Sequence, residues 1–268
     1  MKESYIRRSS IQKELLLVQK QEKALEKAAM RERKTGWKQA LEEKIPEKVF
    51  QNLEKAFCKA FSLVFEKGTG VIERTYRREQ LEQDHLIQDF AFQVREDRKS
   101  LKTLRRSASS SDLRNMAITA AEGIGLGALG IGLPDIVVFV GVLLKGIYET
   151  ALHYGFAYDT PEEQQFILKL MQTAMLRQSE WQEANQEIDR LIESAALPVP
   201  EPGQREEQME HTAQAFAMDM LLLKFVQGLP VAGIVGGAGN PVYYRRVMKY
   251  VQLKYRKRYL LRKQNKTE

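Results

Sequence analysis

The sequence predicts an all-α protein, a single domain of many helices built around two glycine-rich apolar helical hairpins, preceded by a charged helical extension. Three observations support this fold class. Apolar residues recur at helical spacing along most of the chain, several segments begin with helix-capping residues or proline, and a proline that can start a helix closes each glycine-rich run. With 268 residues, 43% of them hydrophobic, the chain can bury a sizeable core.

The N-terminal part of the chain is highly charged. Residues 10–34 carry one compact apolar patch, at residues 15–18, and little else that could form a buried stripe. We therefore expect residues 1–36 to be a helical extension with few core contacts. The helical domain itself is expected to cover residues 37–265.

The first strong helix of this domain begins at Pro46, and Gly68 is expected to end it. Residues 71–104 are polar, with scattered apolar positions, and predict one long helix or two broken ones. The serine cluster at residues 107–111 indicates a loop, after which Asp112 can cap the next helix. The buried stripe of the first helix shares helical spacing and comprises Val49, Leu53, Phe57, Ala60, Phe61 and Val64.

The centre of the chain is an apolar, glycine-dense run, AITAAEGIGLGALGIGLPD. On a helix, Gly123, Gly127 and Gly130 fall on one face, where a neighbouring backbone can approach closely. Pro134 suits the first turn of a new helix, and Asp135 places a negative charge at its positive end. We therefore expect two helices here, the first packed between neighbours.

The helix after Pro134 is apolar all round until Lys145. From there Lys145, Glu149 and His153 recur at a spacing of four, which predicts one face against water or a polar partner. Neither glycine-rich run reaches the ~20 uninterrupted apolar residues of a membrane-spanning helix, because Pro134 and Asp135 divide the longer one.

Further helices follow, separated by clear signals. Thr160 and Pro161, followed by two glutamates, predict a capped helix start. Residues 180–196 continue that helix or form a second one. The proline-rich residues 197–205 predict a linker and a sub-boundary within the domain.

The glycine-rich theme returns near the C-terminus. Twelve of the 17 glycines fall within residues 123–146 and 228–239. The second run includes Gly233 and Gly237 and leads through Asn240 into a proline. We infer a pseudo-repeat of two glycine-rich hairpins that pack on each other.

The last predicted helix is basic. Residues 245–266 contain ten Lys or Arg and no Asp or Glu, more than the whole net charge of +7. Arg256, Lys257 and Lys263 lie away from its tyrosine and valine stripe. Such a face indicates a surface for anionic lipid or nucleic acid, or a helix face in contact with solvent.

Familiar catalytic and cofactor motifs are missing from the sequence. No phosphate-binding lysine follows the glycines, and no dinucleotide-binding pattern is complete. His85, His153 and His211 are far apart and Cys58 is the single cysteine, so no zinc framework is expected. No nucleophile-elbow spacing occurs. We expect neither cofactor nor metal.

Two carboxylates at the ends of the first glycine-rich run are the best candidates for a functional site. Buried in apolar surroundings, Glu122 and Asp135 could hold a proton or a cation, with His153 nearby. The simpler interpretation is that Asp135 caps a helix and Glu122 bonds to backbone at a bend. His153 is likewise more simply a polar-stripe residue facing Glu149.

These segments also carry a resemblance. IPEKVFQNLEKAF, the central glycine-rich run, HYGFxYDTPEEQQFIL, LPVAGIVGGAGN and a basic YxxRYL end occur in the order of the EcsC family of bacterial proteins, over about residues 37–262. The resemblance implies a helical protein without an assigned biochemical activity, named after a gene beside an ABC transporter's subunits. Positions that match the family pattern are Glu122, Gly123, Gly127, Pro134, Asp135, Tyr154, Gly155, Pro230, Gly233, Gly237 and Asn240.

Three functions remain open. The first is a non-enzymatic cytoplasmic protein on the inner face of the membrane, an accessory to an ABC transporter or a secretion or membrane-protease system, with anionic lipid as its partner. The second is a soluble domain that binds a lipid or other apolar ligand between the glycine hairpins, and the third is a hydrolase using Glu122, Asp135 and His153. Nucleic acid is a weaker alternative partner. Expected membrane or ligand contacts are Gly123, Gly127, Gly130, Pro134, Gly233, Gly237, Asn240, Arg256, Lys257 and Lys263.

Overall fold

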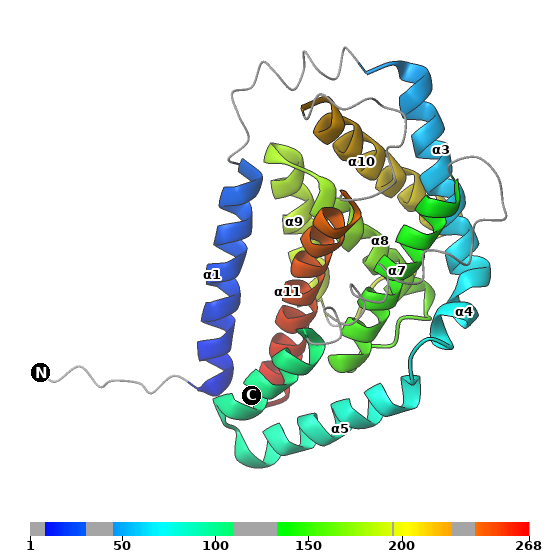
Figure 1. The fold of residues 1–268 in the computed structure, drawn as a ribbon. Helices are drawn as coiled ribbons and strands as arrows, with labels where there is room; N and C mark the ends of the chain where they lie inside the picture. The colour runs from blue at the N-terminus through cyan, green and yellow to red at the C-terminus, as the bar shows by residue number, and fades with distance from the viewer. Residues whose placement is uncertain (1–8, 31–44, 110–132, 195, 227–238, 268) are drawn as a thin grey trace, which may run out of the picture.

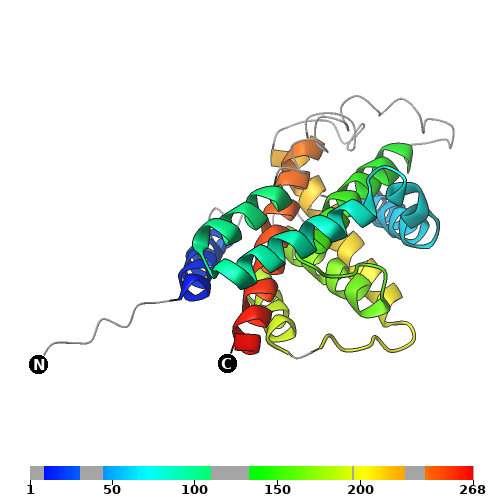
Figure 2. The same cartoon turned by 90° about the horizontal axis from the view of Figure 1, so that it is seen from below.

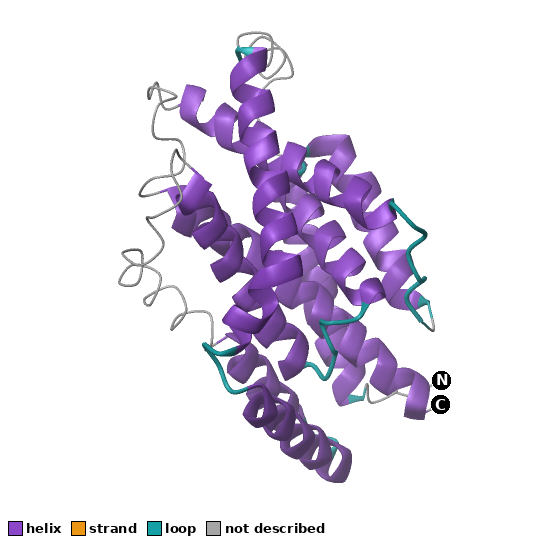
Figure 3. Ribbon diagram, turned by 90° about the vertical axis from the view of Figure 1, so that its right-hand side faces the viewer, coloured by secondary structure: helices purple, strands orange, loops and turns teal. Residues whose placement is uncertain are grey.

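The computed structural model describes residues 9–30, 45–109, 133–194, 196–226 and 239–267. Within these ranges every regular element is a helix and none is a strand, which confirms the predicted all-α fold (Figure 3). The elements are α1 (Ser10–Met30), α3 (Glu47–Leu63), a π-helical turn (Val64–Gly68), α4 (Thr69–Glu73), α5 (Arg78–Arg95), a helix over residues 98–109, α7 (Leu133–His153), α8 (Pro161–Met175), α9 (Gln178–Glu193), α10 (Gln204–Val226) and α11 (Gly239–Thr267).

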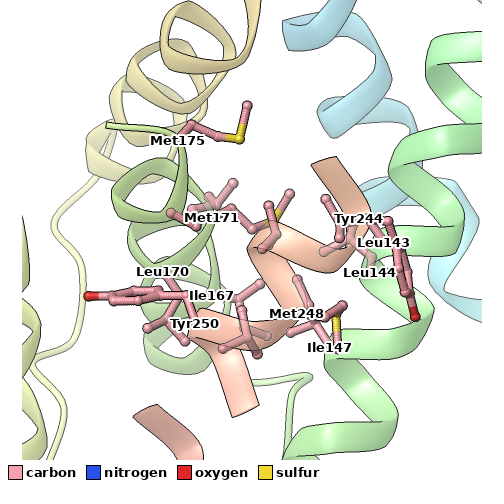
Figure 4. Packing of buried hydrophobic residues seen from close by; sticks show 14 of the residues in the cluster. Leu143, Leu144, Ile147, Ile167, Leu170, Met171, Met175, Tyr244, Met248 and Tyr250 are labelled. Atoms are coloured by element: carbon pink, nitrogen blue, oxygen red, sulfur yellow. The ribbon is translucent and has the colours of Figure 1, made fainter. Parts of the chain in front are cut away.

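Two long helices, α7 and α11, form the centre of the bundle. α11 packs on α1, α7 and α8, while α10 packs on α3 and α8 (Figure 1). Apolar side chains of α7, α8 and α11 meet between them (Figure 4). Gly146 makes the α7–α11 contact close, because a Cβ there would lie 2.5 Å from the hydroxyl of Tyr244 and 3.2 Å from the sulfur of Met248.

α7 contains the most apolar stretch of the described chain. Ile136–His153 has a mean hydropathy of 1.6 over 18 residues, and by length and composition alone it could cross a membrane. The prediction that no run is long enough to span a membrane was made for the two glycine-rich runs and did not consider this stretch. In the fold 72% of it is buried, against α3, α5 and α11, so here it is the core helix of the bundle.

The N-terminal helix is part of the bundle. α1 lies along α11, and Glu14 and Val18 of α1 are buried there (Figure 1). The expectation of few core contacts is wrong. The prediction failed because carboxylates of α1 pair with basic side chains of α11. The periodicity of apolar residues does not reveal such pairs.

The remaining boundaries follow the local signals with three differences. Thr160 caps α8 through the amide of Glu163, as predicted. The chain continues past Gly68 into α4 rather than stopping. Residues 71–104 split into α4, α5 and a further helix, broken at Glu96 in the left-handed region with φ 47°. That further helix extends through residues 107–109, where a loop was expected.

Candidate functional site

Several predicted site residues lie outside what the structure describes. The backbone of α7 and α11 is described at Pro134, Asp135 and Asn240, but their side chains are not. The roles assigned to these positions therefore stay predictions. The candidates that fall wholly outside the described residues are Glu122, Gly123, Gly127, Gly130, Gly233 and Gly237.

His153 is the last residue of α7 and lies inside the protein, 4% exposed. Its backbone carbonyl accepts a hydrogen bond from Nδ1 of His85 at 2.9 Å, since a carbonyl can only accept. Glu149 is buried as well, so the polar stripe of α7 faces protein rather than water. Within the described parts of the chain, no three His, Cys, Asp or Glu side chains are grouped as metal ligands.

The basic residues of α11 do not form an exposed face. The expectation that Arg256, Lys257 and Lys263 lie on such a face is wrong, because each side chain is largely buried and ends on a carboxylate of another helix. The pairs are Arg256 with Glu14, Lys257 with Glu22 and Asp189, and Lys263 with Asp89.

One of these clusters is balanced in charge. Lys254 is fully buried and lies 2.6 Å from both Glu22 and Asp189, the same two carboxylates that Lys257 contacts. Burial opposes the charged form of Lys257, but Asp189 and Glu22 outweigh it and raise the pKa of the ammonium. Two cations thus meet two anions, which is what a buried ionic cluster needs in order to be tolerated.

A different surface combines apolar and basic side chains. α5 runs along the lower edge of the molecule in Figure 1, and its outward side carries large apolar groups that are 66–67% exposed. Between residues 83 and 94 the exposed positions of α5 carry no charge. We call Leu86, Ile87, Phe90 and Val94 the α5 apolar face.

The inward side of α5 combines apolar and polar groups, since Phe92 is buried in the core and His85 and Asp89 also face the bundle. Asp89 accepts hydrogen bonds from the hydroxyl of Tyr259 at 2.7 Å and from the ammonium of Lys263. Burial opposes ionisation of Asp89, but these two donors outweigh it and lower the pKa of the carboxyl. Burial also opposes the charged form of His85 and so lowers the pKa of its imidazole. The His85 ring packs edge-on against Tyr259. α5 therefore packs Phe92, His85 and Asp89 against the bundle and has a second, apolar face that points outward, which is unusual for a surface helix.

The loop after α7 is shaped to receive α5. Gly155 has φ +73°, and a Cβ at this position would lie 2.2 Å from Nε2 of His85. Only glycine meets both conditions easily, since it has no Cβ and populates positive φ without strain. The contact fixes α5 on the bundle, so its apolar face is held outward by the fold.

Positive charges lie next to the α5 apolar face. The helix of residues 98–109 turns back beside α5, joined to it by a hydrogen bond from Gln88 to Ser107 at 3.1 Å (Figure 2). Its exposed positions are mostly basic. We call Arg95, Lys99, Lys102 and Arg106, all exposed, the basic rim.

Sequence reasoning noted apolar residues along α5 but not their direction. Leu86, Phe90 and Val94 recur at a spacing of four, which indicates that they share one helix face. The spacing does not tell whether the face turns inward. The exposure of these side chains, and the partners of Asp89 on α11, show that this apolar face points outward.

Comparison with known proteins gives one result. The family model described as the EcsC protein family matches residues 9–260, a range that includes α1 and every described helix from there to the greater part of α11. No curated protein and no solved structure matches the chain. Because the match spans nearly the whole sequence, in agreement with the order of the glycine-rich and aromatic segments, the chain belongs to the EcsC protein family.

Proposed function

We propose that this EcsC-family chain is a non-enzymatic protein that lies peripherally on the inner face of the cell membrane. The observation that carries the proposal is the α5 apolar face beside the basic rim. Apolar groups that enter the interface, together with cations that meet anionic headgroups, are the two components of interfacial binding. The two components come from α5 and the helix after it, which lie side by side (Figure 2).

The expected energies are sufficient for reversible binding. Full burial of a Leu, Ile or Phe side chain contributes about 1.5–3 kcal/mol, so side chains that are two-thirds exposed can each gain roughly 1–2 kcal/mol in the interface. Each Lys or Arg near an anionic surface adds about 1 kcal/mol. Because α5 is already folded and anchored, binding does not have to order the helix.

The proposed role is that of an accessory to a membrane system, an ABC transporter or a secretion or protease complex. This part rests on the family, whose name derives from a gene that lies beside transporter subunits. A peripheral position on the inner face suits such a role, since it places the protein next to the cytoplasmic parts of a membrane complex.

The alternatives have less support. The pocket expected between the glycine hairpins lies outside the described residues. A described cavity of about 620 Å³ is lined by apolar groups such as Met175 and Leu222 but also by Arg177, Glu183 and Asp219, whose charges do not suit an acyl chain. A hydrolase would need His153 to meet substrate, yet its side chain is buried.

Vesicle flotation tests the proposal. The full chain should float with vesicles that contain phosphatidylglycerol and stay behind with pure phosphatidylcholine vesicles, and salt should weaken the binding. Replacing Leu86 and Phe90 with serine removes roughly 2–4 kcal/mol of apolar transfer. We expect at least tenfold weaker binding of this variant with an unchanged melting temperature, because neither side chain is buried in the fold.

A matched variant controls for loss of exposed apolar surface in general. Val199 in the linker and Val242 at the start of α11 are also exposed, and replacing both with serine should leave flotation unchanged. The proposal would be contradicted if both double variants lost vesicle binding equally, or if the parent bound neutral and anionic vesicles equally well. Salt-sensitive binding to RNA in place of vesicles would identify nucleic acid as the partner instead.

A further inference from the structure

We propose that a small cavity enclosed by α1, the helix of residues 98–109 and α11 binds a phosphate group. The cavity has a volume of about 130 Å³, and none of its lining residues is Asp or Glu. We call it the phosphate cavity. The polar residues of the lining are Gln21, Arg105, Ser109, Tyr154, Lys249, Gln252 and Arg256.

The wall of the cavity carries more positive than negative charge. Glu14 is the carboxylate of this cluster, and three arginines share it: Arg105 at 3.2 Å, Arg98 at 3.5 Å, and Arg256 in close contact. Arg98 is half-exposed and lies outside the lining, but Arg105, Lys249 and Arg256 of the lining are three cations against this one carboxylate, an excess of two positive charges.

This excess differs from the rest of the α1–α11 contact. Further along α11, Lys254 and Lys257 meet Glu22 and Asp189, two against two. The charges are therefore balanced at one cluster, whereas cations are in excess at the other, where Arg256 is buried and Arg105 is half-buried. The unbalanced cluster is the one that borders a cavity.

Arginine cannot relieve the imbalance by losing its proton. A buried lysine can become neutral, but the guanidinium stays charged in proteins. Arg256 is only 5% exposed, and both burial and the charge of Arg105 act against its charged form. An anion in the cavity would compensate these charges directly.

The donors and the size of the cavity select the class of anion. Guanidinium groups bind phosphate oxygens through paired N–H donors, and the hydroxyl of Tyr154 and the ammonium of Lys249 can donate to further oxygens. A phosphate monoester carries about −1.5 to −2 charges at pH 7, which matches the excess of two. The cavity is smaller than the ~300–1,000 Å³ of pockets that take larger ligands, so it suits the phosphate group alone.

Two sources could supply this group: free phosphate, or the monoester headgroup of a lipid such as phosphatidic acid. Binding of free phosphate requires no membrane, so the inference stands whether or not the α5 apolar face contacts lipid. Ser109 and Lys249 are exposed, which leaves the cavity open to solvent and to a headgroup.

The test measures the melting temperature and the binding heat of the full chain with inorganic phosphate, against chloride at equal ionic strength. Phosphate should raise the melting temperature and bind measurably. In Arg105→Gln, Kd should rise at least tenfold. Arg106→Gln, the neighbouring exposed position on the same helix, should bind phosphate like the parent.

Glu14→Gln provides a test of opposite sign. It removes the one anion of the cluster, so the variant should melt lower than the parent without phosphate and gain more from phosphate than the parent does. Soluble dioctanoyl phosphatidic acid distinguishes the sources. If it binds at least tenfold more tightly than inorganic phosphate, the group belongs to a lipid, whereas equal binding indicates the free ion.

Three results would overturn the inference. They are no effect of phosphate beyond that of chloride, an equal effect in Arg105→Gln and the parent, and an equal loss in Arg106→Gln and Arg105→Gln. The last result would mean that the general positive charge of this surface, and not the cavity, attracts phosphate.

Discussion

Replacing Gly155 with alanine should loosen α5 from the bundle. Gly155 has φ +73°, and the new Cβ would lie 2.2 Å from Nε2 of His85 and under 3 Å from two further ring atoms. A non-glycine residue in the left-handed region costs roughly 1–2 kcal/mol. Displacing the ring adds about 1–3 kcal/mol of overpacking, and losing its bond to the carbonyl of His153 adds about 1 kcal/mol.

The cost of Gly155→Ala is therefore about 3–6 kcal/mol when these contributions are summed. For a chain of this length each kcal/mol lowers the melting temperature by about 2–4 °C. Urea denaturation of the purified protein measures the loss directly, through the midpoint and the free energy of unfolding.

A double-mutant cycle separates the two causes. In a His85→Ala background the ring is gone, so Gly155→Ala should cost only the backbone strain of roughly 1–2 kcal/mol. The coupling between the two positions should then be about 2–4 kcal/mol, which is the sum of the overpacking and the lost hydrogen bond. If the two substitutions are additive, the ring does not lie against Gly155, and the described anchoring of α5 is incorrect.

Three further predictions follow from the same contacts. Removing residues 1–34 should destabilise the rest of the chain by at least about 2 kcal/mol, since it exposes buried side chains of α11. An unchanged melting curve would mean that α1 is a loosely attached extension, as first expected. Lys263→Gln should cost about 1.5–3 kcal/mol through its lost bond to Asp89, and NMR should show the pKa of that carboxyl rise; vesicle binding lost at unchanged stability would instead favour an exposed role for this lysine. Stability should fall as the pH drops below about 6.5, because burial, together with the charges of Arg262 and Lys263, lowers the pKa of His85 in the folded chain, so that the unfolded chain takes up the proton first. A second loss follows below about pH 4, because the pKa of Asp89 is lowered in the fold and the unfolded chain again binds its proton first. His85→Gln should abolish the first loss and keep the second, and a full first loss in that variant would assign it to another group.

Local signals were sufficient for much of the fold. Thr160 followed by Pro161 and two glutamates fixes the start of α8, because a capping oxygen and a preset φ act within one turn. The stripe of Leu53, Phe57 and Phe61 is buried as its spacing predicted. Such features depend on residues that are neighbours in sequence.

The partners of charged side chains could not be predicted in this way. Arg256 and Glu14 are separated by 242 positions, and neither neighbourhood shows that they meet. The ten basic residues near the C-terminus suggested an exposed face, yet the carboxylates that neutralise several of them come from α1, α5 and α9. A charge run indicates a surface only when its counter-charges are absent, and that depends on tertiary structure.

The α5 apolar face was hidden for a related reason. Phe90 and Asp89 are adjacent, so on a helix their side chains diverge by about 100° and cannot both lie at the centre of one face. The usual expectation buries the phenylalanine. Here Tyr259 and Lys263 draw Asp89 inward, and the phenylalanine is left outside.

The most direct test of the account places an environment-sensitive fluorophore on the α5 apolar face. Cys58, whose pKa is raised to about 11 by burial and by nearby carboxylates, is first replaced with alanine. A nitrobenzoxadiazole label is then attached at Phe90→Cys or, as a control, at Val199→Cys. On phosphatidylglycerol vesicles the label at position 90 should shift its emission to the blue and be quenched by brominated lipid, while the label at 199 should not change. If the protein floats with the vesicles while the label at 90 still reports water, the membrane contacts another surface, and the central claim is wrong.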